Sequence, residues 1–209
     1  LAINRAGKLI WRLDLADPLT QAPIIGFDGR LFVPTRNRLR AVSAAGRLLW
    51  SRELPGPIEN MTFEPNRGGL LASSGRALIH LSPWGHLSSI DAGRTIKAIS
   101  GAEAIEGIEG IEGREGVDGW TAVAALDNGT IVRVQGDRIQ PFASVTASRE
   151  VSAIAVQEGR VYVLLRDGYL SALALSNGEL AWQEKTLAIG EAKLMVDERG
   201  IYCLGRTGS

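Results

Sequence analysis

The stretch Ala41-Val42-Ser43-Ala44-Ala45-Gly46-Arg47-Leu48-Leu49-Trp50 decides the fold, because the chain repeats it. Residues 2–11 and 172–182 end in the same way, with a glycine four residues before a tryptophan. The unit that Trp50 ends also contains Phe32, and its equivalents are Leu71, Val123, Tyr162 and Tyr202, at spacings of 39, 52, 39 and 40 residues. A period near 40 with several short apolar strands is typical of a β-propeller blade.

Glycine turns separate the strands within each unit. Polar-glycine pairs occur at Asp28-Gly29, Asn128-Gly129, Glu158-Gly159, Asp167-Gly168 and Arg199-Gly200. Glycine adopts positive φ at little cost, which tight hairpins require. The segments between the turns are rich in Val, Ile, Leu, Tyr and Phe, which favour strands. Helical periodicity is absent, so the pattern predicts an all-β protein.

The two ends of the chain together make one unit. Residues 183–209 provide the first two strands of a blade, and residues 1–11 provide the last two. We therefore expect a closed, monomeric propeller of five four-stranded blades, in which pairing of the N- and C-terminal strands hides the free sheet edges. The expected blades are residues 12–50, 51–89, 90–142, 143–182, and 183–209 with 1–11. The alternative is a part of a seven- or eight-bladed ring.

Composition excludes several classes of protein. Lys and Arg number 23 and Asp and Glu number 23, so no net field attracts nucleic acid or an anionic membrane. No apolar stretch approaches the roughly 20 residues of a membrane span. The single Cys203 excludes an internal disulfide and takes an apolar strand position in the repeat. The chain begins at Leu1 rather than Met, which indicates a mature or excised piece of a longer protein.

The segments ending at Trp50 and Trp182 resemble the tryptophan-docking motif of the pyrroloquinoline-quinone-like (PQQ-like) repeat family. In that motif, of the form Ala-x-Asp-x-x-Thr-Gly-x-x-x-Trp, the Trp packs against the neighbouring blade. The resemblance gives Trp11, Trp50 and Trp182 structural docking roles. Two copies have decayed, with Ser89 and Phe142 at the Trp position.

The resemblance also bears on activity. Quinone-dependent dehydrogenases of this family use a vicinal Cys-Cys disulfide and bound calcium, whereas this chain has one cysteine and no calcium-loop spacing of Asp, Asn and Glu. We therefore expect no cofactor, no metal and no catalytic residues. The chain resembles the non-catalytic branch, whose members are protein-binding scaffolds of the bacterial cell envelope. This implies a periplasmic or envelope-associated domain with an unidentified protein partner.

Blade three carries an unusual insertion at residues 101–119. An acidic residue recurs there at every third position, and glycine directly follows most of these acids. Glycine at this density raises the entropy cost of ordering, and like charges repel. The pattern is typical of a solvated low-complexity loop, and the alternatives are an acidic tether for a basic partner or, less favoured, a metal site.

The candidate binding residues come from the starts of the innermost strands and from one aromatic side chain. On the repeat alignment the starts of these strands form the rim of the central funnel. The candidates for partner binding are Gln21, Asn60, Arg94, Glu150 and Glu191 at this rim, together with Trp84.

Two other functions use the same rim. Glu59, Glu150 and Glu191 could form the acid and base of a glycoside hydrolase, whose carboxylate separation would decide its mechanism. A lectin-like propeller would bind sugar instead, although the rim residues differ from blade to blade. The minimal loops outside blade three favour a non-enzymatic, protein-binding scaffold over both.

Overall fold

In the computed structural model every regular element is a β-strand. The structure describes residues 1–26, 28–64, 69–102, 121–145 and 150–207; the insertion at 101–119 therefore lies, apart from its first two residues, outside the described part. The strands are β1 (Ala2–Ile3), β2 (Leu9–Trp11), β3 (Ile24–Ile25), β4 (Leu31–Thr35), β5 (Arg38–Val42), β6 (Leu48–Glu53), β7 (Asn60–Phe63), β8 (Leu70–Ser74), β9 (Ala77–Leu81), β10 (Leu87–Asp91), β11 (Ile96–Gly101), β12 (Thr121–Leu126), β13 (Thr130–Gln135), β14 (Arg138–Ser144), β15 (Val151–Gln157), β16 (Arg160–Leu165), β17 (Tyr169–Ala174), β18 (Leu180–Lys185), β19 (Ala188–Asp197) and β20 (Gly200–Thr207).

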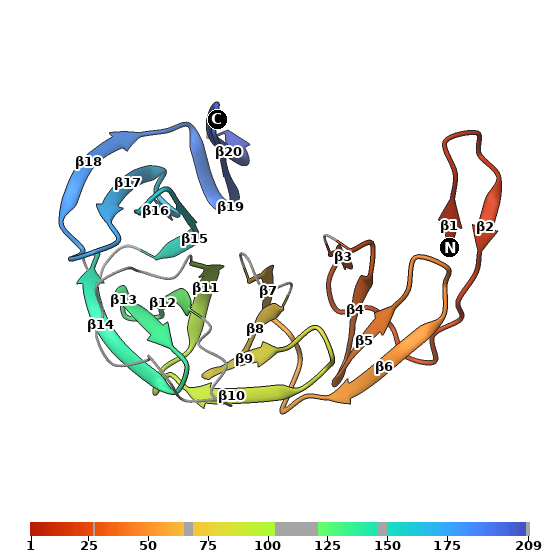
Figure 1. Ribbon diagram of the computed structural model, residues 1–209. Coiled ribbons are helices and arrows are strands. Elements are labelled where there is room, and N and C mark those ends of the chain that lie inside the picture. The colour runs from red at the N-terminus through yellow and green to blue at the C-terminus, as the bar shows by residue number, and fades with distance from the viewer. Residues whose placement is uncertain (27, 65–68, 103–120, 146–149, 208–209) are drawn as a thin grey trace.

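The strands form four complete blades. Each blade is an antiparallel sheet of four consecutive strands: β3–β6 (blade 1), β7–β10 (blade 2), β11–β14 (blade 3) and β15–β18 (blade 4). The innermost strands β7, β11, β15 and β19 contact one another in succession. Figure 1 shows the blades following one another along an arc, with their outermost strands on its convex side. This confirms the predicted all-β propeller architecture.

The predicted closure of the ring is not confirmed. The chain ends form two separate two-stranded sheets, the N-terminal hairpin (β1–β2) and the C-terminal hairpin (β19–β20). Figure 1 shows them on opposite sides of the gap in the arc. The N-terminal hairpin is held to blade 1, where Trp11 Nε1 donates a hydrogen bond of 2.8 Å to the carbonyl oxygen of Ala44. The packing between successive blades sets the curvature, and that curvature does not bring the two hairpins together.

Each docking tryptophan sits on the outermost strand opposite an alanine. The Cα partners across the sheet are Ala2 with Trp11, Ala41 with Trp50, and Ala172 with Trp182. A register shift beside each pair leaves one extra residue in the outermost strand, as in a β-bulge. The small alanine leaves room for the indole, and the bulge turns the indole toward the next blade.

The indoles pack onto glycine turns of the neighbouring blade. A Cβ atom added to Gly46 would lie 2.6 Å from the Trp11 ring, and one added to Gly85 would lie 2.9 Å from the Trp50 ring. Both glycines also have positive φ, 79° and 80°. Two independent constraints, conformation and space, therefore require glycine there. The rings of Trp11 and Trp50 therefore lie at contacts between successive blades.

The two decayed blades have His80 and Arg133 at the third-strand position that alanine takes in blades 1 and 4. In blade 2 the register is unshifted, so His80 lies opposite Ser88, and Ser89 lies opposite Ile79. The buried His80 imidazole is 3.0 Å from the buried carboxylate of Glu64. In blade 3 the Arg133 guanidinium lies 5.5 Å from the centre of the Phe142 ring. A charged or ring-bearing side chain on the third strand thus replaces the alanine where the tryptophan is missing.

Candidate functional site

The sequence-predicted site residues divide between two faces of the arc. The turns that join the second and third strands of a blade lie beside the starts of innermost strands, because Ile96 N donates to Gly75 O and Arg166 N donates to Glu150 O. We call this the rim face. It carries five of the candidates: Gln21, Asn60, Arg94, Glu150 and Glu191. Trp84 lies in the turn between β9 and β10, at the other end of the strands, which we call the far face. The predicted set is therefore not one site.

Polar contacts hold the first of the rim residues in place. The Gln21 side-chain amide donates to the Ile58 carbonyl oxygen at 3.2 Å, which connects the starts of blades 1 and 2. The Asn60 amide donates to Ser73 Oγ at 2.9 Å within blade 2. Both side chains are half-buried. These hydrogen bonds fix the Gln21 and Asn60 side chains at the rim.

Arg94 pairs with a carboxylate on the following turn. Its Nε atom lies 2.6 Å from Asp127 Oδ1. The hydrogen bond from the Arg94 side chain lowers the pKa of Asp127 below its ordinary value, and the guanidinium charge adds to the effect. The arginine is exposed, so the pair contributes little to stability.

Glu150 and Glu191 share one cation at the surface. Arg166 Nη1 lies 2.9 Å from Glu150, and its Nη2 lies 2.8 Å from Glu191. Both carboxylates are exposed and are held by the same guanidinium. Glu59 is also exposed, and no described ion pair joins it to this group. Of the three carboxylates, the structure therefore joins Glu150 and Glu191 through Arg166.

Trp84 is the most exposed large hydrophobic side chain among the described residues, at 81%. Its turn, residues 82–86, is internally bonded: Ser82 N donates to His86 O, and Gly85 N donates to Ser82 O, both at 2.9 Å. His86 N also donates to Ser82 Oγ at 3.0 Å. The indole is therefore presented to solvent from a rigid turn.

Blade 1 fixes this turn from three directions. Arg52 Nε donates to the Gly85 carbonyl oxygen at 2.6 Å. Arg30 donates to the Pro83 carbonyl oxygen, and its guanidinium lies 5.9 Å from the centre of the Trp84 ring. The third contact is Trp50, which covers Gly85. Because the Arg30 side chain is also ion-paired with Asp28, its position is fixed in turn.

Sequence reasoning missed Arg30 and Arg52. Arg52 alternates with Trp50 on β6, so the period of two would have placed both on one face of that strand. For Arg30 no local signal exists, because its contact partner Pro83 lies 53 residues away.

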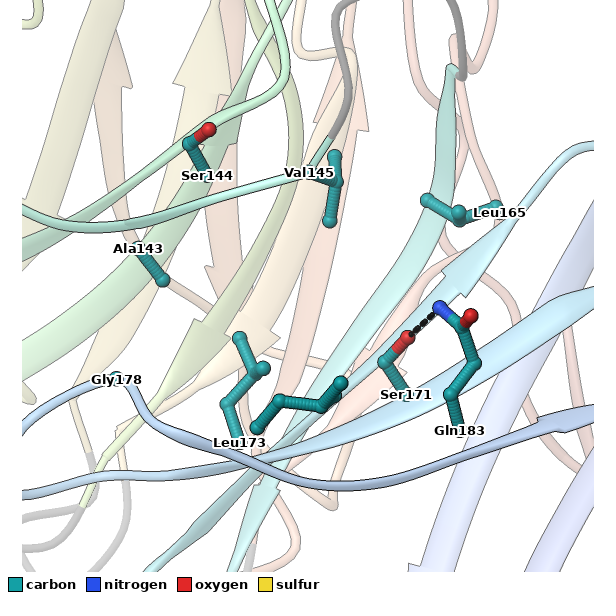
Figure 2. Close-up of a pocket in the computed structure, with 9 residues that line it drawn as sticks. Ala143, Ser144, Val145, Leu165, Ser171, Leu173, Gly178 and Gln183 are labelled. Atoms are coloured by element: carbon teal, nitrogen blue, oxygen red, sulfur yellow. Dashed lines mark hydrogen bonds between the residues drawn. The ribbon is translucent and has the colours of Figure 1, made fainter.

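A cleft between blades 3 and 4 was also missed. It measures about 220 Å³ and lies between the end of β14 and strands β17 and β18. Figure 2 shows Ser171 and Gln183 on one side of it, joined by a hydrogen bond of 2.8 Å, with Ala143, Ser144 and Val145 across from them. The one polar pair in view is mutually satisfied, and the remaining lining side chains are mostly apolar.

The described residues do not fit a quinone and calcium site. They contain no group of three or more His, Cys, Asp or Glu side chains arranged to hold a metal ion. The single Cys203 cannot form a disulfide with a neighbour, and partial burial raises the pKa of its thiol. Within the same part of the chain, no helix has the length and apolar character needed to cross a membrane.

Tryptophan-docked blades around an arc define a propeller-type repeat protein. The model of a family described as outer membrane protein assembly factor BamB matches residues 1–186, and the chain belongs to this family. The predicted PQQ-like repeat is thereby confirmed. A search of curated proteins found no match.

Solved structures show the same fold at low sequence identity. The computationally designed Ika8 protein matches with a TM-score of 0.62 and 12% identity, over 88% of this chain and 54% of that chain. BBS1N in complex with ARL6DN matches in a lead-soaked crystal with a TM-score of 0.62 and 12% identity, over 86% of this chain and 59% of that chain. In a mercury-soaked crystal the same complex matches with a TM-score of 0.63 and 15% identity, over 89% of this chain and 59% of that chain. This chain therefore spans between half and two thirds of the length of these structures.

Proposed function

We propose that this chain is a non-enzymatic, protein-binding scaffold domain of a bacterial cell-envelope protein, located on the periplasmic side. The family description, which names an outer membrane assembly factor, supports both the scaffold role and the compartment. A scaffold needs a rigid surface with a few well-packed anchors rather than a reactive site.

The Trp84 turn carries this proposal. Binding hot spots are enriched in tryptophan and arginine, and they cost least when the side chains are already ordered before the partner arrives. Trp84 meets this condition because residues 82–86 are bonded internally and held by Arg30 and Arg52. Arg30 stands beside the indole at the edge of the same patch, where its ion pair with Asp28 and its bond to Pro83 keep it in place.

The repeat itself indicates that Trp84 is not required for folding. The equivalent turn of blade 1 has Ala45 at this place, and the N-terminal hairpin has Ala6. Both turns close with the same hydrogen bond as residues 82–86, from the glycine N–H to the residue three before it. An exposed aromatic retained where two sister turns have alanine favours a role in recognition.

The test compares two faces of one protein. Trp84→Ala and the rim variant Glu191→Ala are each immobilised and incubated with bacterial envelope extract, and bound proteins are quantified by mass spectrometry. We expect Trp84→Ala to lower capture of a specific partner at least tenfold, since hot-spot truncation costs about 2 kcal/mol or more. Glu191→Ala should leave capture unchanged.

Two outcomes contradict the proposal. Equal capture by wild type and Trp84→Ala would remove the far face from consideration. A raised melting temperature with one member of a monosaccharide panel, lost in a rim variant but not in Trp84→Ala, would support the lectin function in its place.

A further inference from the structure

The outer turn, which joins the last two strands of a sheet, lies on the far face and recurs along the arc. In three neighbouring sheets a basic residue follows its glycine: Lys8 in the N-terminal hairpin, Arg47 in blade 1 and His86 in blade 2. In blade 4 the same place holds Glu179, and the shorter turn of blade 3 carries Asp137. Basic side chains therefore mark this position on one half of the arc, and acidic side chains mark it on the other.

Packing between blades leaves this position open to solvent. The Trp11 ring covers Gly46, but the next residue, Arg47, is exposed. His86 is also exposed, although the Trp50 ring covers the glycine before it. A basic side chain at this position is therefore presented to solvent even where a neighbouring sheet packs against the turn.

The outer turns of blades 1 and 2 form one continuous surface. A Cβ atom added to Gly29, in the turn between β3 and β4, would lie 3.6 Å from the Cβ atom of Ala44 in the outer turn of blade 1. Arg30 of the same β3–β4 turn donates to the Pro83 carbonyl oxygen and lies beside the Trp84 ring. The β3–β4 turn thus bridges the two outer turns. We call residues 28–30, 43–47 and 82–86 the basic strip.

Positive charge is in excess on the basic strip. Asp28 is its one acidic residue, and the ion pair with Arg30 leaves these two side chains neutral together. Among the described residues, no carboxylate lies within ion-pair distance of Arg47. Lys8 extends the positive charge onto the N-terminal hairpin, whose indole is hydrogen-bonded to the outer turn of blade 1.

Apolar side chains border the basic strip at both ends. Leu48 and Leu49 directly follow Arg47 and are exposed, and Trp84 is exposed on the blade 2 side. A partner that complements this surface therefore combines negative charge with a few apolar side chains.

We propose that the basic strip binds an extended acidic segment of a protein partner, with a carboxylate at Arg47 and an apolar side chain against Trp84. This inference rests on the proposed scaffold function and adds the chemistry of the partner. Charge complementarity also gives the segment a place along the arc. Its acids are attracted to Arg47 and Lys8 and repelled by Asp137 and Glu179 on the other half.

A protein segment fits the basic strip better than an anionic membrane surface does. Asp28 is exposed between the two outer turns, so its carboxylate would face lipid phosphates as a like charge. A peptide can direct a backbone N–H at this carboxylate and still place its own acids at Arg47 and Lys8.

A library of random short peptides displayed on phage tests the chemistry of the partner. The library is selected in parallel on immobilised wild type, Arg47→Glu and Arg160→Glu, and the enriched sequences are compared. We expect wild type to enrich Asp and Glu beside an aromatic or aliphatic residue, and Arg47→Glu to lose this enrichment. Arg160→Glu is the matched control and should select as wild type does. It makes the same change in net charge at an arginine that is exposed on the far face of blade 4.

The affinity of one enriched peptide, labelled with fluorescein, is then measured by anisotropy. Arg47→Glu should weaken binding about tenfold, because it replaces an attraction with a repulsion, and Arg160→Glu should stay within about twofold of wild type. Wild-type affinity should fall as the salt concentration rises from about 50 mM to about 500 mM, since salt screens exposed charges. Trp84→Ala should weaken binding about tenfold at both salt concentrations, because its contact is apolar.

Three results would overturn the proposal. The first is selection on wild type without an excess of acidic residues, or equal selection of acidic peptides on Arg47→Glu. The second is binding of anionic phospholipid vesicles that Arg47→Glu abolishes, with no acidic peptide selected, which would assign the basic strip to a lipid surface. The third is selection of acidic peptides only after residues 103–118 are deleted, which would assign the basic strip to the acidic insertion of this chain.

The outcome is separable from the test of the proposed function. An envelope protein whose capture is lost in Trp84→Ala and retained in Arg47→Glu would support the scaffold function and overturn the acidic partner. Acidic peptides selected by wild type, with envelope capture unchanged in both variants, would support the basic strip and contradict the scaffold function.

Discussion

At the scale of single residues, the third strand and the docking position change together. Alanine on the third strand accompanies tryptophan on the fourth, whereas His80 and Arg133 occupy the third strand where the tryptophan is lost. The reason is volume: an indole and a long side chain cannot fill the same space, and a core tolerates neither overlap nor void. In blade 2 this replacement leaves a buried acid and a buried imidazole in contact.

Three substitutions separate docking from recognition. Trp50→Ala should lower the free energy of unfolding by about 2 kcal/mol or more, because it removes the contacts with Phe32 and Gly85. The loss should be smaller than for a fully buried tryptophan, because Trp50 is only half-buried. Trp84→Ala should stay within about 0.5 kcal/mol of wild type, as surface changes do. Urea unfolding monitored by circular dichroism measures all three.

Trp50→Phe is the third variant and the control. Trp50 Nε1 is buried without a hydrogen-bond partner among the described atoms, so a phenyl ring retains most of the packing and removes an unpaired donor. We expect it to remain within about 1 kcal/mol of wild type. Equal losses for Trp50→Ala and Trp84→Ala would show that exposure does not separate the two roles.

At the scale of elements, the N-terminal hairpin is attached to blade 1 by one indole. Trp11 combines a hydrogen bond to Ala44 with a ring placed over Gly46, so one side chain provides both direction and packing. The same arrangement recurs between blades 1 and 2, where the Trp50 ring covers Gly85. There the Arg30 side chain, and not the indole N–H, donates the hydrogen bond to the equivalent carbonyl oxygen, that of Pro83. The contact between blades is therefore repeated, with an indole N–H as the hydrogen-bond donor in one case and a guanidinium in the other.

A pair of glycine substitutions isolates this attachment. Gly46 and Gly93 have nearly the same φ, 79° and 75°, but only Gly46 has an indole over it. Alanine at either place costs about 1–2 kcal/mol from the left-handed conformation. Gly46→Ala should cost at least about 1 kcal/mol more than Gly93→Ala, because its added methyl group would overlap the Trp11 ring. It should also shift the Trp11 indole N–H signal in NMR spectra. Equal destabilisation, with that signal unmoved, would contradict the docking role of Trp11.

At the scale of the whole molecule, burial is concentrated in the middle of the arc. All six residues of β12 are buried, and the buried apolar clusters join the sheets of successive blades. Among the described residues, the strands at the two ends have exposed side chains and form sheets of only two strands each. Local stability should therefore fall from the centre of the arc toward its ends.

Hydrogen exchange measured by mass spectrometry tests this gradient. In dilute protein the amides of β12 and β16 should exchange slowest, and those of β1 and β2 fastest. Exchange in β1 and β2 as slow as that in β12 would contradict this gradient.

Much of this architecture could be read from local patterns. The strands, the glycine turns and the docking tryptophans all depend on residues within one 40-residue unit. The positions of Ala41, Gly46 and Trp50 can be recognised from their spacing alone. Ring closure could not be read in this way. Whether Tyr202 meets Ala2 of the same chain depends on the curvature summed over the successive blade contacts, and no single repeat encodes that sum.

The amino-acid sequence by itself determined an all-β chain of propeller blades, because side-chain alternation and positive-φ glycines act over a few residues. Only the tertiary structure decided that Trp84 and the rim residues lie on opposite faces, that Arg30 and Arg52 hold the Trp84 turn, and that the arc stays open. These features depend on contacts between segments far apart in the sequence, such as Arg52 with Gly85 and Arg30 with Pro83. Such contacts exist only once the blades have packed.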